Sequence, residues 1–161
     1  MRYLWSLGDS QRGGRPIKWL QAHPIWKKYA GRFPVTLVKT ADLDRKEKYI
    51  LGYHPHGAAC IGAFYNFATE GTGFSDKFPG IRPYLTNHRQ THYMPMYREF
   101  LHSFGIGDSS KENIRHILQQ KGHMVVIVVG GVREALMTDP EEHYLVLKER
   151  KGFVKMAIQM G

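Results

Sequence analysis

A short strand and an abrupt turn are predicted at residues 49–57, which read YILGYHPHG. The apolar residues 49–53 suit a buried strand, and the proline fixes one backbone angle and biases His54 toward an extended conformation. Gly57 allows a turn, or a close approach of a substrate to the backbone. Because α/β enzymes place catalytic side chains at such junctions, the imidazoles of His54 and His56 are the sharpest chemical feature of the chain.

Strand-like and helix-like segments alternate along the 161 residues, which predicts one α/β domain. Strands are expected at 35–38, 49–53, 84–88, 124–129 and 144–147. Helices are expected at 58–68, 95 to 105 or 107, from the cap at 108–110 to about 121, 132–137 and 152–159. For the third of them Asp108, Ser109 and Ser110 are N-cap candidates, and Ser109 with Glu112 fits a capping box. Residues 124–129 are apolar throughout and should be buried on both faces. We therefore predict a mixed, partly parallel sheet flanked by helices, with ligands bound at the strand ends.

The basic charge is concentrated in the N-terminal segment. The chain has a net charge of +9, and residues 1–39 hold eight basic side chains and one acid, Asp9. All three tryptophans, Trp5, Trp19 and Trp26, lie in the same segment. Tryptophan interleaved with Lys and Arg is typical of a membrane interface, while a solvated face and a nucleic-acid-binding arm are the alternatives. We expect an irregular or partly helical arm at residues 1–33.

Several classes of structure are disfavoured. The chain has no run of about 18 apolar residues, so no spanning helix is expected, and the N-terminus lacks the apolar core of a signal peptide. The single cysteine, Cys60, excludes an intrachain disulfide framework and a paired-cysteine zinc site. Because Cys60 stands in an apolar run, a packed thiol is expected rather than a nucleophile.

The two histidines of residues 53–57 permit three roles. They could ligate a metal, but the other histidines form no H-E-x-x-H pattern. They could pack or form hydrogen bonds at a turn. General base catalysis is favoured, because imidazole titrates near neutral pH. A second junction at 130–134 also follows an apolar strand, so both could open on one crevice in which backbone N–H groups suit an oxyanion or a phosphate.

Residues 53–57 resemble the signature of the diacylglycerol acyltransferase type 2 family, which includes monoacylglycerol and wax-ester acyltransferases. Segments similar to further family blocks follow the family order at 33–40, 95–99, 129–136 and 150–155. The resemblance covers residue 33 to the C-terminus, and the basic arm is similar to the segment after the family's membrane hairpin. It implies a glycerolipid-acyltransferase-like fold.

Two departures from the family pattern concern length. The family normally begins with one or two spanning helices, and it continues past this chain's last block with further strands and a loop that closes the acyl site. The chain therefore resembles an internal fragment, incomplete at the C-terminus. We expect residues 1–33 to be a basic, Trp-rich, membrane-proximal arm and 34–161 the N-terminal portion of the acyltransferase domain, with weak or no activity alone.

The resemblance implies transfer of a fatty acyl group from acyl-CoA to the hydroxyl of diacylglycerol, forming triacylglycerol. Monoacylglycerol or a wax alcohol is the alternative acceptor, and a non-catalytic lipid-surface-binding fragment is the alternative class. It further implies acyl-CoA as co-substrate with no bound cofactor or metal, no nucleic-acid partner, and a place at the endoplasmic reticulum membrane or the lipid droplet. A homo-oligomer is compatible with it.

Within this family His56 is the predicted general base and His54 the second choice. The backbone N–H groups of Gly57 and Ala58 would stabilise the oxyanion. The aspartate of the broader glycerolipid acyltransferase motif is absent, because Ala59 or Ile61 stands at its position, counted from His54 or His56. We expect Glu134 to orient the imidazole in its place.

Cationic side chains are expected near the phosphates of CoA. Arg98 is the first candidate, with a salt bridge to Glu99 or Glu134 as its structural alternative. Weaker candidates are Arg133, Arg150, Lys151 and Lys155. The aromatic residues Phe64, Tyr65 and Phe67 are expected to pack in the core, with the lining of an acyl channel as the alternative.

Overall fold

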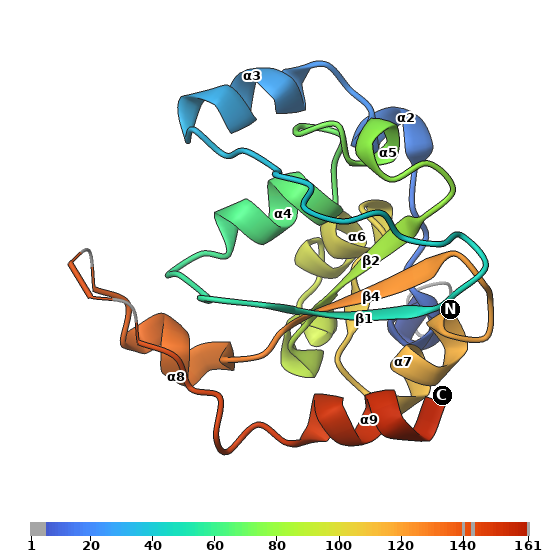
Figure 1. Ribbon diagram of the computed structural model, residues 1–161, viewed down its shortest axis with the longest axis vertical. Helices are drawn as coiled ribbons and strands as arrows, with labels where there is room; N and C mark the ends of the chain where they lie inside the picture. Colours follow the sequence, from blue (N-terminus) through green and yellow to red (C-terminus); the bar gives the residue numbers. More distant parts are fainter. Residues whose placement is uncertain (1–5, 140, 143, 161) are drawn as a thin grey trace.

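The computed structural model describes residues 6–139, 141, 142 and 144–160. Its centre is a sheet with the strand order β1-β4-β2-β3 (Figure 1). The strands are β1 (Tyr49–Tyr53), β4 (His123–Val128), β2 (Arg82–Asn87) and β3 (Gly107–Asp108). The α/β class is confirmed, and the sheet that was expected to be partly parallel is parallel at each of the three pairings between these strands.

Helices cover both faces of the sheet (Figure 1). One core cluster joins the sheet to α4 (Ile61–Phe67), α5 (Phe74–Lys77) and α6 (Tyr97–Ser103). A second joins the other face to α7 (Lys111–Ile117) and α9 (Gly152–Met160). The 3-10 helix η2 (Arg89–Tyr93) follows β2, and α8 (Gly131–Leu136) follows β4.

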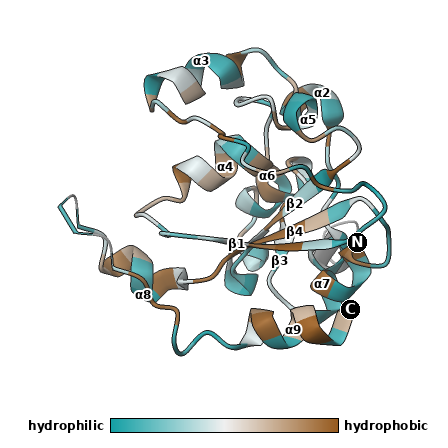
Figure 2. Cartoon of the chain, in the orientation of Figure 1, coloured by the Kyte–Doolittle hydropathy of each residue, from teal (hydrophilic) through white to brown (hydrophobic). Residues whose placement is uncertain are grey.

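Strand β4 is the buried strand that its sequence predicts. Met124 and Val126 contact the α4–α6 side, whereas Val125 packs on the α7–α9 side, as the two-residue period of a strand requires. Figure 2 shows apolar residues in this strand and also on α8 and α9. Burial on both faces explains why β4 is apolar after His123.

Two predicted strands are wrong. Residues 35–38 pair with no strand. Leu37 packs against the core and Val38 faces solvent, so their apolar side chains need no place in the sheet. Residues 144–147 also form no strand, and the backbone N–H of Val146 donates instead to the side chain of Glu134. Apolar alternation alone did not separate these segments from a paired strand.

One predicted helix start and one predicted capping box are also wrong. Helix α4 begins at Ile61 instead of residue 58, because Gly57 and Cys60 have positive φ angles of 62° and 51° and turn the chain. Helix α7 is capped by Ser110, whose hydroxyl accepts from the N–H of Asn113 at 3.2 Å. Ser110 was one of the three predicted cap candidates, whereas Ser109 of the predicted capping box donates its own N–H to the carbonyl of Asn87, next to the pairing of β3 with β2.

The N-terminal segment is partly helical, with η1 (Ser6–Arg12), α2 (Lys18–Gln21) and α3 (Ile25–Arg32). It packs closely on the rest of the chain, since the N–H groups of Arg15 and Ile17 each donate at 2.8 Å to carbonyls of α6. Trp26 packs edge-on against Phe64 and Phe104. Trp19 is 69% exposed, and Trp5 lies outside the described residues.

Candidate active site

The two junctions singled out in the sequence lie side by side at the carboxyl edge of the sheet. Strands β1 and β4 are parallel neighbours, with Tyr53 opposite Val128. The chain segments that leave them therefore start at the same edge, where open α/β sheets bind ligands. The backbone N–H of His56 donates to Glu134 Oε1 at 2.5 Å, which joins the two junctions directly.

Glu134 is a buried carboxylate that holds backbone segments together. Its Oε1 accepts from His56 N, its Oε2 accepts from Val146 N at 2.8 Å, and Oε2 lies 3.9 Å from His54 Nδ1. The hydrogen bonds of Glu134 go to the backbone, where the sequence had suggested a bond to an imidazole. Gly130 makes this arrangement possible, because a Cβ there would overlap the carboxylate.

The ring of His56 has a defined proton position. Its Nδ1 lies 2.6 Å from the carbonyl oxygen of Gly57. Since a carbonyl oxygen can only accept, Nδ1 carries the proton and Nε2 of the neutral ring holds the free electron pair. A carbonyl thus orients this imidazole, in the role that the sequence analysis gave to Glu134.

The thiol of Cys60 packs against the same loop. Its Sγ donates to the carbonyl of His56 at 3.2 Å and lies 3.3 Å from His56 Nδ1. Burial, and next the charge of Glu134, raise the pKa of Cys60 to about 11. Cys60 is therefore a protonated thiol at neutral pH, in agreement with the expected packed thiol.

His54 occupies a different environment from His56. The His54–Pro55 peptide bond is cis. The ring of His54 lies beside Gly52 on the α9 side of the sheet, and its buried Nδ1 faces Glu134. The two histidines of the motif are therefore separated, and His56 is the one that lines the cavity next to the junctions.

This cavity has a volume of about 670 Å³ and lies at the carboxyl ends of β2 and β4. Helices α4, α6 and α8 form its walls, and its lining is mainly apolar. Polar side chains also contribute to the lining, namely Cys60, Thr86, Asn87, His88, Thr91 and Ser109 besides His56. An apolar cavity of this size with a few polar groups is typical of a small-molecule site.

A family model described as diacylglycerol acyltransferase matches residues 1–161, the whole of this chain. The chain belongs to the diacylglycerol acyltransferase family. This agrees with the resemblance of residues 53–57 and of the four ordered blocks.

Named relatives in this family are similar along nearly all of the chain. Human 2-acylglycerol O-acyltransferase 3 is 45% identical over 152 residues, which are 93% of this chain and 45% of the relative. Diacylglycerol O-acyltransferase 2A of Umbelopsis ramanniana is 46% identical over 153 residues, 94% of this chain and 43% of the relative. Human diacylglycerol O-acyltransferase 2 is 44% identical over 164 residues, with shares of 99% and 42%. The chain spans less than half the length of these relatives, and no solved structure matches it significantly.

The predicted cations of this family member have different surroundings. Arg98 is fully buried in α6, and its guanidinium lies 3.4 Å from Glu99 Oε1, the structural alternative named above. Arg150 Nη2 donates to the carbonyl of Gly130 at 3.1 Å, which places it at the second junction. Lys151 and Lys155 are exposed at the start of α9. Contact of any of them with CoA stays a prediction.

The aromatic residues of α4 divide between the core and the cavity. Phe64 lines the cavity, whereas Tyr65 and Phe67 are buried, as expected for core packing. Sequence analysis missed two further aromatic residues of the cavity wall, Tyr97 and Phe100 of α6. Tyr97 lies in the sequence block at 95–99 and Phe100 follows it directly. This position could have identified them, but only Arg98 was selected from that block.

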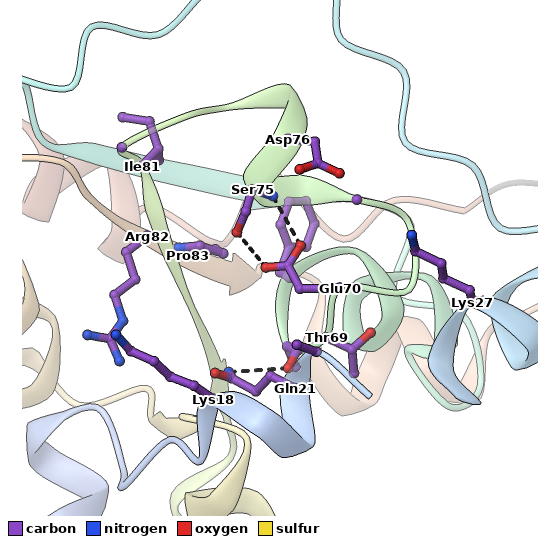
Figure 3. A pocket seen from close by; sticks show the side chains of 15 residues that line it. Lys18, Gln21, Lys27, Thr69, Glu70, Ser75, Asp76, Ile81, Arg82 and Pro83 are labelled. Carbon is purple, nitrogen blue, oxygen red and sulfur yellow. Dashed lines mark hydrogen bonds between the residues drawn. The ribbon is translucent and has the colours of Figure 1, made fainter. Parts of the chain in front are cut away.

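A second cavity of about 650 Å³ reaches the start of β2, at the opposite end of the sheet strands (Figure 3). Its charged side chains have both signs, with Lys18 and Arg82 on one side and Glu70, Asp76 and Lys27 toward the other (Figure 3). The carboxylate of Glu70 already accepts from the N–H and hydroxyl of Ser75. The junction residues lie at the other cavity.

Within residues 6–139, 141, 142 and 144–160, His, Cys, Asp and Glu side chains form no group of three that could hold a metal ion. Each helix in this range is too short or too polar to cross a bilayer.

Proposed function

We propose that the protein transfers a fatty acyl group from acyl-CoA to the free hydroxyl of diacylglycerol, forming triacylglycerol. The observation that carries this proposal is the imidazole of His56, with Nδ1 2.6 Å from the carbonyl oxygen of Gly57, in the lining of a large apolar cavity of a diacylglycerol acyltransferase family member. The names of the relatives include diacylglycerol and 2-acylglycerol as acceptors, so monoacylglycerol is the alternative acceptor. A wax alcohol is a further alternative.

In this mechanism His56 acts as the general base. Its Nε2 accepts the proton of the acceptor hydroxyl while the oxygen attacks the thioester carbonyl. The tetrahedral intermediate then collapses, the C–S bond breaks, and the imidazolium returns the proton to the departing CoA sulfur. A base of this kind contributes about 10²- to 10⁴-fold to the rate.

The loop after β1 offers donors for the oxyanion of the intermediate. Gly57 has a φ of 62°, which favours glycine, and nothing lies within 4 Å of the position that a Cβ would take there. A thioester can approach the backbone on this open side. We assign the oxyanion contact to the N–H groups of Gly57 and Ala58.

Glu134 is a positioning residue in this scheme. It fixes the backbone of His56 relative to β4, and its charge lies 3.9 Å from His54 Nδ1. His54 supports the loop from the α9 side, and His56 faces the substrates. Arg150, Lys151 and Lys155 are the cations proposed to meet CoA, whereas Arg98 is assigned a structural role because it is fully buried beside Glu99.

The membrane surface is the proposed location of the reaction, at the endoplasmic reticulum or the lipid droplet. Helices α2 and α3 and their flanks expose apolar side chains, namely Ile17, Trp19, Ile25, Tyr29 and Phe33. Exposed cations stand among them, including Lys18, Lys27 and Lys28. This composition suits insertion at the headgroup level of an anionic membrane. The same surface supports the second candidate, a lipid-surface-binding chain without turnover.

The test is transfer of a labelled acyl group from acyl-CoA to diacylglycerol in membranes, with the protein expressed from its whole gene. His56→Ala should lower kcat by about 100-fold or more. The matched control is His116→Ala, which removes an exposed imidazole on α7 and should leave kcat unchanged. Full activity of His56→Ala would contradict the assignment of His56 as the general base. His54→Ala would then be measured in the same assay. Membrane binding without transfer by the parent protein would favour the second candidate.

A further inference from the structure

We propose that Phe100 sets the length of the fatty acyl chain that the cavity accepts. This inference rests on the proposed acyl transfer and names the part of the cavity that binds the chain. Phe100 and Tyr97 lie one helical turn apart on α6, and both line the cavity together with Phe64 of α4. The rings of Tyr97 and Phe100 are stacked at 6.2 Å, and those of Phe100 and Phe64 at 6.0 Å. Three side chains thus form one continuous aromatic wall.

The topology separates His56 from the α6 part of this wall. His56 follows β1, at the edge of the sheet, whereas α6 follows β2, two positions across in the order β1-β4-β2-β3. The cavity crosses the carboxyl ends of β4 and β2 between them. With its carbonyl at His56, an acyl chain that crosses these strand ends runs toward α6 and reaches the aromatic wall with its distal carbons.

The rings of the wall differ in how firmly they are held. Phe64 is fixed from behind by edge-on contacts with Trp26 at 5.7 Å and Phe104 at 5.1 Å. Phe100 also contacts Phe104, yet 43% of it is exposed. Phe100 therefore stands between the anchored Phe64 and Tyr97, and its partly exposed ring blocks further extension of the chain. Its removal opens the wall without emptying the core.

The size of the effect follows from the apolar surface of a chain. Each methylene that a protein buries changes binding by about fourfold. A pocket that excludes or admits one methylene discriminates by about 10- to 200-fold. Phe100→Ala should therefore move the preferred acyl length to longer chains and raise the longest-to-shortest affinity ratio at least about 10-fold. Phe100→Trp should move the preference to shorter chains.

The experiment measures chain-length profiles in two ways. Binding of non-hydrolysable thioether analogues of acyl-CoA, in a graded series of chain lengths, is measured by calorimetry and needs no turnover. Competition between acyl-CoAs in the transfer assay then gives relative kcat/KM for the protein expressed from its whole gene. Tyr93→Ala is the matched control, because Tyr93 is an exposed aromatic residue of η2 outside the cavity lining, and its profile should equal that of the parent.

Opposite shifts for the alanine and tryptophan variants, with no shift for Tyr93→Ala, support the proposal. Parental profiles for both Phe100 variants overturn it, and so does a shift of equal size in Tyr93→Ala. If Phe100→Ala fails to fold, the binding profile of Phe100→Trp decides alone. A parent protein that neither binds the analogues nor transfers acyl groups contradicts the proposed function. Transfer by the parent with unchanged Phe100 variants contradicts this inference alone.

Discussion

Glu134 lies on helix α8, but its carboxylate is buried, unlike that of an ordinary surface glutamate. Both of its oxygens accept from backbone N–H groups, one of the loop after β1 and one of residue 146. The buried carboxylate therefore replaces backbone pairing for two irregular segments. A buried donor that loses its acceptor costs about 1 to 3 kcal/mol.

Glu134→Gln should lower the free energy of unfolding by about 1 to 3 kcal/mol. The side-chain NH₂ of glutamine can only donate, so one of the two backbone N–H groups that bind Glu134 would lose its acceptor. The substitution should also lower kcat by more than the folded fraction explains, since the His56 backbone loses its fixed position. Denaturant unfolding and the transfer assay measure the two effects. Glu112→Gln, at an exposed position of α7, is the control and should change neither. Parental stability and kcat in Glu134→Gln would contradict the role described.

For single residues, the sequence predicted that Glu134 and the two histidines lie close together but not which atoms form the hydrogen bonds. Glu134 and the two histidines were placed at neighbouring strand ends by the pattern of strands alone. The acceptor of the His56 ring is the carbonyl of Gly57, and the second partner of Glu134 is Val146. Such bonds depend on the path of irregular loops, which hydrophobic periodicity does not specify.

Among the elements, helix α7 has an N-cap whose position can be tested by mutation. The hydroxyl of Ser110 accepts from the N–H of Asn113, whereas Ser109 belongs to the end of the strand pairing. Ser110→Ala should lower the free energy of unfolding by about 1 kcal/mol. Ser109→Ala should stay within about 0.5 kcal/mol of the parent. Urea unfolding compares the two variants, and an equal loss in both would contradict the position of the cap.

A buried histidine pair connects η2 to α6. His92 Nδ1 and His102 Nε2 lie 3.2 Å apart, and both residues are buried. Burial lowers the pKa of both, in His102 to about 4, and His92 lowers the pKa of His102 further. The charged groups that act on the pair are Arg98, Asp108, Asp9, Arg15 and Glu99. The pair is therefore neutral in the folded protein at neutral pH.

Stability should fall when the pH drops from about 6.5 toward about 4. In this range the unfolded chain binds protons at histidine that the folded chain excludes, so protonation favours unfolding. The contribution is complete above the unfolded pKa and is lost as the pH falls toward the folded value. Each excluded proton adds a slope of at most about 1.4 kcal/mol per pH unit. Urea midpoints across this range should show a smaller slope for His102→Gln than for the control His116→Gln, and equal slopes would contradict the prediction.

The element scale also shows the limit of pattern reading. The strands predicted at 49–53 and 124–129 were found because the sheet covers apolar side chains there, partly in β1 and fully at Met124, Val125 and Val126 of β4. Segments 35–38 and 144–147 have similar apolar residues but lie outside the sheet, where Leu37 packs singly against the core and Val146 binds Glu134. Tertiary placement, which the local pattern does not contain, separates the two cases.

In the whole molecule, the proposed active site and the proposed membrane-binding surface lie on different parts of the fold. The carboxyl edge of the sheet carries the cavity, and α2 and α3 carry the exposed apolar side chains. Trp26 connects them, because its ring packs on Phe64, which lines the cavity. The charge pattern of the sequence indicated the interface, but only the structure separates the exposed Trp19 from the packed Trp26.

Membrane binding should therefore depend on Trp19 of α2 and on the lysines of α3. Replacing both Lys27 and Lys28 by Gln should weaken binding to anionic vesicles by about 30-fold, since each cation near such a surface contributes about 1 kcal/mol. Trp19→Ala should weaken binding to anionic and neutral vesicles alike, because it removes apolar contact and no charge. Vesicle co-flotation at low and high salt separates the two effects, since salt screens only the lysine contribution. Tyr144→Ala, an exposed aromatic residue far along the chain, is the control. Unchanged flotation of the Trp19 variant would place the membrane contact elsewhere on the molecule.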